Sequence, residues 1–208
     1  MAASSETYPA RLTIDYPERC DRLTTLLRIP VILPILLVLG LVTGGESQFQ
    51  HLPRWSVVYG GGGYLFAATV LMLVFRKKYP RWWFDWNLAL TRFAARVLSY
   101  FAVLTHQYPS TDEEQAVHIE IAYPDAAKDL NRWLPLVKWL LAIPHIIVLA
   151  FLNLAVVICT IIGWFAIVFT GKYPRGIFDF VVGVVRWDLR VMAYALLLTT
   201  DAYPPFGF

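Results

Sequence analysis

Long apolar runs alternate with polar segments along this chain, and their lengths predict helices that cross a membrane. Residues 26–42 and 55–75 are apolar and are separated by the polar run Gly44-Gly45-Glu46-Ser47-Gln48. A helix needs about 20 apolar residues to cross a hydrocarbon core of about 30 Å. We therefore predict two membrane-spanning helices, joined by a short outer loop, in the first half of the chain.

The second half contains a continuous apolar stretch of 37 residues, 134–170. This stretch is too long for one crossing, so we predict two shorter spans, 134–152 and 154–170, with a tight turn near Asn153. Because backbone polar groups in lipid must be hydrogen-bonded within the chain, both spans are predicted to be helical.

Each apolar pair is followed by a mixed segment, 82–104 or 178–198, that carries arginines near its middle. The arginines are Arg92 and Arg96 in the first segment and Arg186 and Arg190 in the second. An arginine at the centre of a spanning helix costs about 2.5–3.5 kcal/mol, so these segments are predicted to be amphipathic helices in the membrane interface. The alternative is a third span in each half, with the second half inverted.

The distribution of positive charge favours the arrangement with four spans. On that arrangement 17 of the 18 lysines and arginines lie on one side of the membrane, and Arg54 alone lies outside. Positive residues accumulate on the cytoplasmic side, so both termini are predicted to be cytoplasmic. The N-terminal segment lacks the pattern of a cleavable signal peptide, and anchoring is predicted to come from the internal helices.

Two short segments, 10–16 and 117–122, alternate apolar and polar residues as half-buried strands do. A lone strand is unstable, so we predict that the two strands pair with each other on the cytoplasmic surface. Pairing between two protomers is the alternative.

The two halves also share sequence. The run from Phe75 to Arg81 recurs 94 residues later from Phe169 to Arg175, and further matches follow at the same offset. We therefore predict two repeat units, 1–109 and 110–208. The predicted fold is an all-α integral membrane protein, a tandem repeat of two transmembrane helical hairpins. Each hairpin is followed by an amphipathic interfacial helix, and a short cytoplasmic two-stranded β element completes the fold.

Composition agrees with a membrane protein and limits the partners. Hydrophobic residues make up 58% of the chain and charged residues 16%, against about 45–50% and 25% in soluble domains. The mean hydropathy is +0.54. The net charge of +3 gives no reason to expect nucleic acid as a partner. Cys20 lies in a polar segment and Cys159 in an apolar run, so a disulfide between them is not expected.

The basic residues are the main candidates for a binding site. Because the planar guanidinium group suits phosphate, we predict contacts with lipid phosphate by six arginines. They are Arg81, Arg92, Arg96, Arg175, Arg186 and Arg190. Asp85 and Asp179 are predicted to form structural ion pairs with these arginines. The alternative is that the ion pairs only fix the interfacial helices in place.

The other candidate residues are weaker indications of a functional site. The run from Gly60 to Gly63 is predicted to allow close helix packing. His145 lies in an apolar segment and could ligate haem, but no second histidine lies at a comparable depth, so hydrogen bonding within a kinked helix is favoured. We find no pattern of a catalytic or metal site, and predict neither an enzyme nor a cofactor other than phospholipid.

Several of these motifs resemble one known family. They are Leu141-Ala142-Ile143-Pro144-His145, the run from Gly163 to Arg175, Phe178-Asp179-Phe180, and the closing Leu198-Thr199 with Tyr203-Pro204-Pro205-Phe206. With these motifs the chain resembles domain-of-unknown-function family 4389, a group of bacterial and archaeal multi-pass membrane proteins. The resemblance implies a location in the inner membrane of a prokaryote. It implies no activity.

Three functions follow as hypotheses. The first is a non-enzymatic membrane scaffold or accessory subunit that contacts anionic lipid on the cytoplasmic face and packs with other subunits or with copies of itself. The second is a small transporter or channel built on the internal repeat. The third is a haem- or quinone-binding anchor that uses His145.

Overall fold

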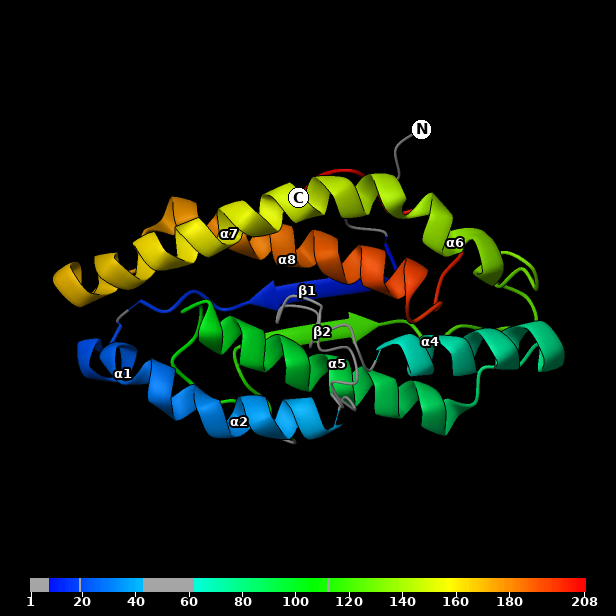
Figure 1. Ribbon diagram of the computed structural model, residues 1–208, viewed down its shortest axis with the longest axis horizontal. Helices are drawn as coiled ribbons and strands as arrows, with labels where there is room; N and C mark the ends of the chain where they lie inside the picture. Colours follow the sequence, from blue (N-terminus) through cyan, green and yellow to red (C-terminus); the bar gives the residue numbers. More distant parts are fainter. Residues whose placement is uncertain (1–7, 19, 43–61, 112) are drawn as a thin grey trace, which may run out of the picture.

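The computed structural model describes residues 8–18, 20–42, 62–111 and 113–208. A two-stranded ribbon lies at its centre (Figure 1). Helix α8 (Arg175–Ala195) runs along the ribbon on one side and α5 (Arg81–Phe101) on the other. Helix α7 (Ile143–Thr170) lies outside α8, and α2 (Arg28–Val42) lies outside α5.

The ribbon consists of β1 (Ala10–Ile14) and β2 (Val117–Ile121), which pair in antiparallel register. Leu12 lies opposite Ile119 at the centre. In both strands the first, third and fifth residues are buried and the other two are exposed. The predicted pairing of the two strands within one chain is therefore confirmed, and the alternation of residue types explains why one face of the ribbon is covered.

Helices α5 and α8 cover the buried face of the ribbon. They begin directly after Pro80 and Pro174, which have extended backbone conformations at the N-caps. Phe84 of α5 and Val181 of α8 join one core cluster with Leu12 of β1. The two predicted helices, 82–104 and 178–198, are thus present, and each buries one face in the protein core.

The predicted second hairpin is wrong. Short helix α6 (Pro135–Leu141) is followed by α7, which is one unbroken helix of 28 residues. No turn occurs at Asn153, which lies within the regular helix α7. Its side chain donates to Asp188 of α8. The chain bends instead at Ala142, directly before Ile143-Pro144, where proline suits the first turn of a helix.

The predicted first hairpin lies partly outside the described residues, because 43–61 are not described. Short helix α1 (Arg22–Leu26) leads into α2, and α4 (Gly62–Leu71) continues as the π-helical turn η3 (Met72–Arg76). Among the described residues, α7 alone is long and apolar enough to cross a membrane. The predicted tandem repeat of transmembrane hairpins is therefore wrong, because within the described residues the other apolar helices are too short and α5 and α8 belong to the core.

Two tight corners connect the outer helices to α5 and α8. Lys77 ends η3 with φ of 48°, and Gly171 ends α7 with φ of 74°. Both residues therefore adopt the left-handed conformation, which glycine adopts without strain and lysine does not.

Candidate functional site

An exposed apolar surface on α7 is the most prominent feature of the molecule. The buried residues of this helix form one narrow stripe made of His145, Leu149, Gly163 and Ile167. Much of the rest of the helix surface is apolar and exposed, and Phe151 and Phe169 are 72% and 74% exposed. Only 11% of the most apolar window of α7 is buried in the protein. A core helix of a soluble protein would be mostly buried.

Exposed apolar residues also lie on α6, which leads into α7, and on α2, which lies beyond α5 on the other side of the ribbon (Figure 1). Leu136, Trp139 and Leu140 are exposed on α6, and Leu33, Leu37 and Leu41 are exposed on α2. Soluble monomers rarely expose continuous apolar patches larger than a few hundred Å², and larger ones mark contacts with a partner or a membrane. We refer to the exposed apolar residues of α2, α6 and α7 as the apolar surface.

Arg92 and Arg186 do not point to this surface. The Nε atom of Arg92 donates to the carbonyl of Ile119 at 3.1 Å, and the Nε atom of Arg186 donates to the carbonyl of Leu12 at 3.1 Å. Each arginine therefore satisfies a strand carbonyl that the ribbon itself leaves without a partner. The lipid-phosphate role predicted for them is not supported by these contacts and stays a prediction.

Arg96 and Arg190 are buried and also bind backbone. Arg96 donates to the carbonyl of Ser110 at 2.9 Å, and Arg190 donates to the carbonyl of Gly207 at 3.1 Å. Arg190 is 2% exposed. These two side chains fix the segments that follow α5 and α8 and are not accessible to a lipid headgroup in this conformation.

Arg81, Arg92 and Arg175 are the exposed members of the predicted set, and of these only Arg92 donates to a strand carbonyl. The Arg81 guanidinium lies 5.2 Å from the ring centre of Tyr123, and that of Arg175 lies 4.4 Å from the ring centre of Tyr16. A guanidinium over an aromatic face keeps its edge free for further hydrogen bonds. These two arginines are therefore the ones able to meet an anion from solvent.

The predicted ion pairs of Asp85 and Asp179 are not formed. Both side chains are exposed. The salt bridges among the described residues join His118 to Asp15, Lys128 to Asp125 and Lys138 to Asp201. Asp85 and Asp179 lie one turn into their helices on the solvent side, away from the arginines that face the ribbon.

The predicted packing glycines fall at the edge of the described residues. Gly60 and Gly61 lie outside them, and Gly62 and Gly63 begin α4. The predicted packing role of the four glycines therefore stays a prediction.

His145 is fully buried beneath the C-terminal segment. Its Nδ1 atom accepts a hydrogen bond from Trp187 Nε1 at 3.1 Å, and its ring stacks on Phe206 at 3.9 Å. The Nε2 atom is buried and has no hydrogen-bond partner. A haem iron could reach this atom only if the stacked aromatic side chains moved away. The arrangement fits the hydrogen-bonded histidine that the sequence favours.

Two buried cations were not recognised as site residues from the sequence. Arg28 donates to the carbonyls of Tyr100 at 2.5 Å and Thr105 at 3.0 Å. Lys138 donates to the carbonyl of Thr200 and lies 2.7 Å from a carboxylate oxygen of Asp201. Both residues lie inside apolar stretches of the sequence. This position predicts that each cation has a hydrogen-bonding partner, since a buried charge without one is costly.

Two side chains, one beside Arg28 and one on α8, have shifted pKa values. Arg28 approaches Nδ1 of His106 at 3.1 Å, and burial together with this positive charge lowers the pKa of His106. On α8, burial raises the pKa of Asp188 to about 6, although the hydrogen bond from Asn153 acts in the opposite direction.

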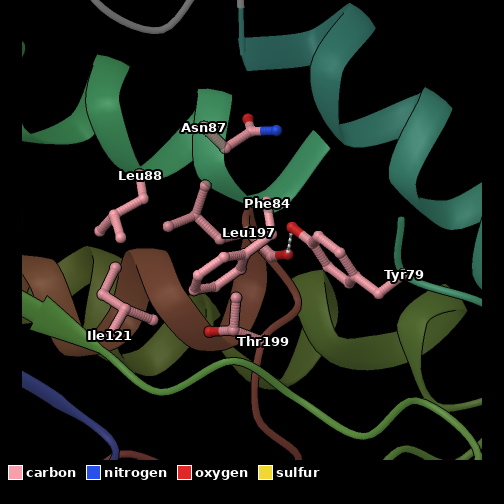
Figure 2. Close-up of a pocket in the computed structure, with 7 residues that line it drawn as sticks. All are labelled: Tyr79, Phe84, Asn87, Leu88, Ile121, Leu197 and Thr199. Atoms are coloured by element: carbon pink, nitrogen blue, oxygen red, sulfur yellow. Dashed lines mark hydrogen bonds between the residues drawn. The ribbon is translucent and has the colours of Figure 1, made fainter. Parts of the chain in front are cut away.

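Two hollows lie among the described residues. Figure 2 shows the crevice between α5, β2 and the segment after α8, where Tyr79 donates to the carbonyl of Leu197 at 2.9 Å. The crevice has no room for a water molecule. A second hollow of about 350 Å³ lies at the surface around Tyr123, Asp129 and Asp201. Among the described residues no group of three histidine, cysteine or acidic side chains could hold a metal ion.

In the part of the chain that the structure describes, these features define a helical protein with one candidate membrane helix and a small charged ribbon. Residues 133–207 match the model of the family described as a domain of unknown function (DUF4389). The resemblance inferred from the sequence motifs is confirmed over these residues. No curated protein and no solved structure matches the chain.

Proposed function

We propose that this protein is a non-enzymatic membrane-bound scaffold or accessory subunit, located at the cytoplasmic face of the inner membrane of a prokaryote. The single observation that carries the proposal is the exposure of α7, whose most apolar window is 11% buried. At about 25 cal/mol for each Å² of apolar area removed from water, covering such a surface with lipid is strongly favourable.

Anionic headgroups are the proposed polar partner. Arg81 and Arg175 keep exposed guanidinium groups at the starts of α5 and α8, and Lys172 is exposed beside Arg175. Each basic residue near an anionic membrane surface contributes about 1 kcal/mol. The other predicted arginines are engaged with backbone and are not part of this proposal.

We also propose that the two halves derive from one duplicated unit. Tyr16 donates to the carbonyl of Tyr173 at 2.5 Å, and Tyr123 donates to the carbonyl of Tyr79 at 2.6 Å. Each strand corner thus bonds to the helix corner of the opposite half. Other subunits, or a second copy of the chain, would be held against the apolar surface that lipid leaves uncovered.

Vesicle flotation tests the proposal. The full chain is expected to float with phosphatidylglycerol vesicles, and less with phosphatidylcholine vesicles or at high salt. Phe151→Asp with Ile158→Asp should reduce flotation with both lipids, because both side chains are exposed apolar residues of α7. Arg81→Gln with Arg175→Gln should reduce it with phosphatidylglycerol alone.

Thr13→Asp, on the exposed face of β1, is the control and should change neither result. A chain that stays with the soluble fraction under all conditions would overturn membrane binding. Native mass spectrometry from mild detergent tests the scaffold role, and a monomer without lipid or partner would contradict it.

A further inference from the structure

We propose that α6 and α7 lie lengthwise in one leaflet of the membrane, with the ribbon toward water, so that α7 does not cross the bilayer. The inference rests on the proposed membrane binding and specifies how the apolar surface meets lipid. Three independent observations carry it.

First, the middle of α7 lies level with the middle of the ribbon. Asn153, in the central part of α7, donates to the carboxylate of Asp188 at 3.0 Å. Two residues earlier on α8, Arg186 donates to the carbonyl of Leu12, the central residue of β1. A bilayer crossed by α7 would therefore have the ribbon near its midplane.

The ribbon cannot be placed there against lipid. Its uncovered face carries the exposed residues Arg11, Asp15, His118 and Glu120. The His118 and Asp15 side chains form an ion pair at 3.3 Å and are 49% and 72% exposed. Each charged side chain at the bilayer centre costs about 2.5–3.5 kcal/mol or more, and open sheet edges do not occur against hydrocarbon.

The apolar helix and the polar ribbon lie on different faces of α8. Val181 and Leu189 of α8 pack in the core that contains the strands. Val184 and Trp187 pack in the cluster that contains Leu149 of α7. α7 is thus able to enter lipid while the exposed face of the ribbon stays in water.

Second, α7 is longer than a crossing requires. Its 28 residues extend over about 42 Å at 1.5 Å per residue. This length exceeds a hydrocarbon core of about 30 Å, so a crossing without tilt would place both helix ends in the headgroup regions. A helix that lies in the interface can have this length without extending beyond the apolar region.

Third, basic residues flank both ends of the helix pair. Lys128 and Arg132 are exposed before α6, and Lys172 and Arg175 are exposed after α7. A crossing helix usually shows an excess of lysine and arginine on one side. Equal basic flanks fit a helix whose two ends meet the same anionic surface.

Labelling of introduced cysteines from each side of the membrane tests the orientation. The full chain, with Cys20→Ser and Cys159→Ser, receives either Arg132→Cys or Lys172→Cys. A membrane-impermeant maleimide is expected to label both positions from the same side of the membrane and neither position from the other side. Labelling of the two positions from opposite sides would overturn the proposal.

A depth measurement keeps the test decisive if either cysteine variant fails to fold or to label. A fluorophore on Ile158→Cys, which is 53% exposed at the centre of α7, is placed in vesicles that contain lipids with nitroxide at defined depths. Stronger quenching by shallow nitroxides supports the proposal, and stronger quenching by nitroxides at the chain ends contradicts it. Failure of flotation would reject membrane binding itself, whereas flotation with deep quenching would reject only the in-plane orientation.

Discussion

Arg92 and Arg186 hold the ribbon from its two outer edges by the same contact. Each donates from Nε to the carbonyl of a central strand residue at 3.1 Å, and these acceptors, Ile119 and Leu12, lie opposite each other in the ribbon. The helix of each half thereby binds the strand of the other half. The two halves are connected across the ribbon and are not two separate hairpin units.

Removing either arginine contact should destabilise the fold. We expect Arg186→Met to lower the free energy of unfolding by about 1–2 kcal/mol, because a carbonyl at the ribbon edge loses its donor. Arg92→Met should lower it by less, since Arg92 is more exposed. Chemical unfolding in mild detergent measures both. Lys128→Gln, at an exposed surface position, should have no effect beyond about 0.5 kcal/mol, and a similar loss in this control would contradict the assignment.

The buried pair of Lys138 and Asp201 should respond unequally to single substitutions. Asp201→Asn leaves the fully buried Lys138 ammonium without a countercharge, and we expect a loss of about 3 kcal/mol. Lys138→Met should cost less, because the Asp201 side chain is 21% exposed and still accepts from the Asn131 amide. The double variant should be more stable than Asp201→Asn alone. Strictly additive losses in this cycle would show that the two groups do not interact.

Asp188 should make stability dependent on pH. Its pKa is raised to about 6 in the folded protein from a usual 3.8, so the folded state favours the protonated form and loses stability as pH rises through this range. Asp188→Asn should therefore raise the melting temperature at pH 7.5, by an amount corresponding to about 1–2 kcal/mol, and leave it unchanged at pH 4. Asp179→Asn, an exposed position on the same helix, is the control. An equal effect of Asp188→Asn at both pH values would contradict the buried environment.

The corner after α7 should require glycine. Gly171 has φ of 74°, where a side chain costs about 1–2 kcal/mol, although an added Cβ would meet its nearest neighbour, Arg22 Nε, at an ordinary contact distance of 3.5 Å. We expect Gly171→Ala to lower stability by about that amount, and Lys77→Gly, at the corner with φ of 48°, to raise it by about 1 kcal/mol. Thermal unfolding of both variants provides the comparison. The two substitutions should change the stability in opposite directions. A gain in stability from Gly171→Ala would contradict the left-handed conformation of this residue.

The sequence predicted those elements that local patterns determine. Alternation of apolar and polar residues located β1 and β2, and their pairing followed because a single strand is unstable. The amphipathic pattern located α5 and α8. Their partners could not be predicted, because Arg186 and Leu12 are 174 positions apart in the chain. Arginines in the middle of a helix predict lipid contacts, whereas Arg92 and Arg186 donate to strand carbonyls in the structure.

The error in the second half has a simple cause. Dividing the stretch 134–170 into two spans assumes that this stretch crosses a membrane. Pro144 indicated a different division, since proline favours the first turn of a helix, and α7 does begin at Ile143. Pro144 therefore predicts the start of α7, whereas the length of the apolar stretch does not.

The most direct test of the account is the environment of α7 in membranes, measured by spin-label accessibility at Ile158→Cys, with Thr13→Cys on the ribbon as reference. The account predicts that the label at position 158 collides readily with oxygen and poorly with a water-soluble nickel complex, and that the label at position 13 shows the reverse. Equal access of the nickel complex to both positions would contradict the claim that the apolar surface of α7 contacts lipid.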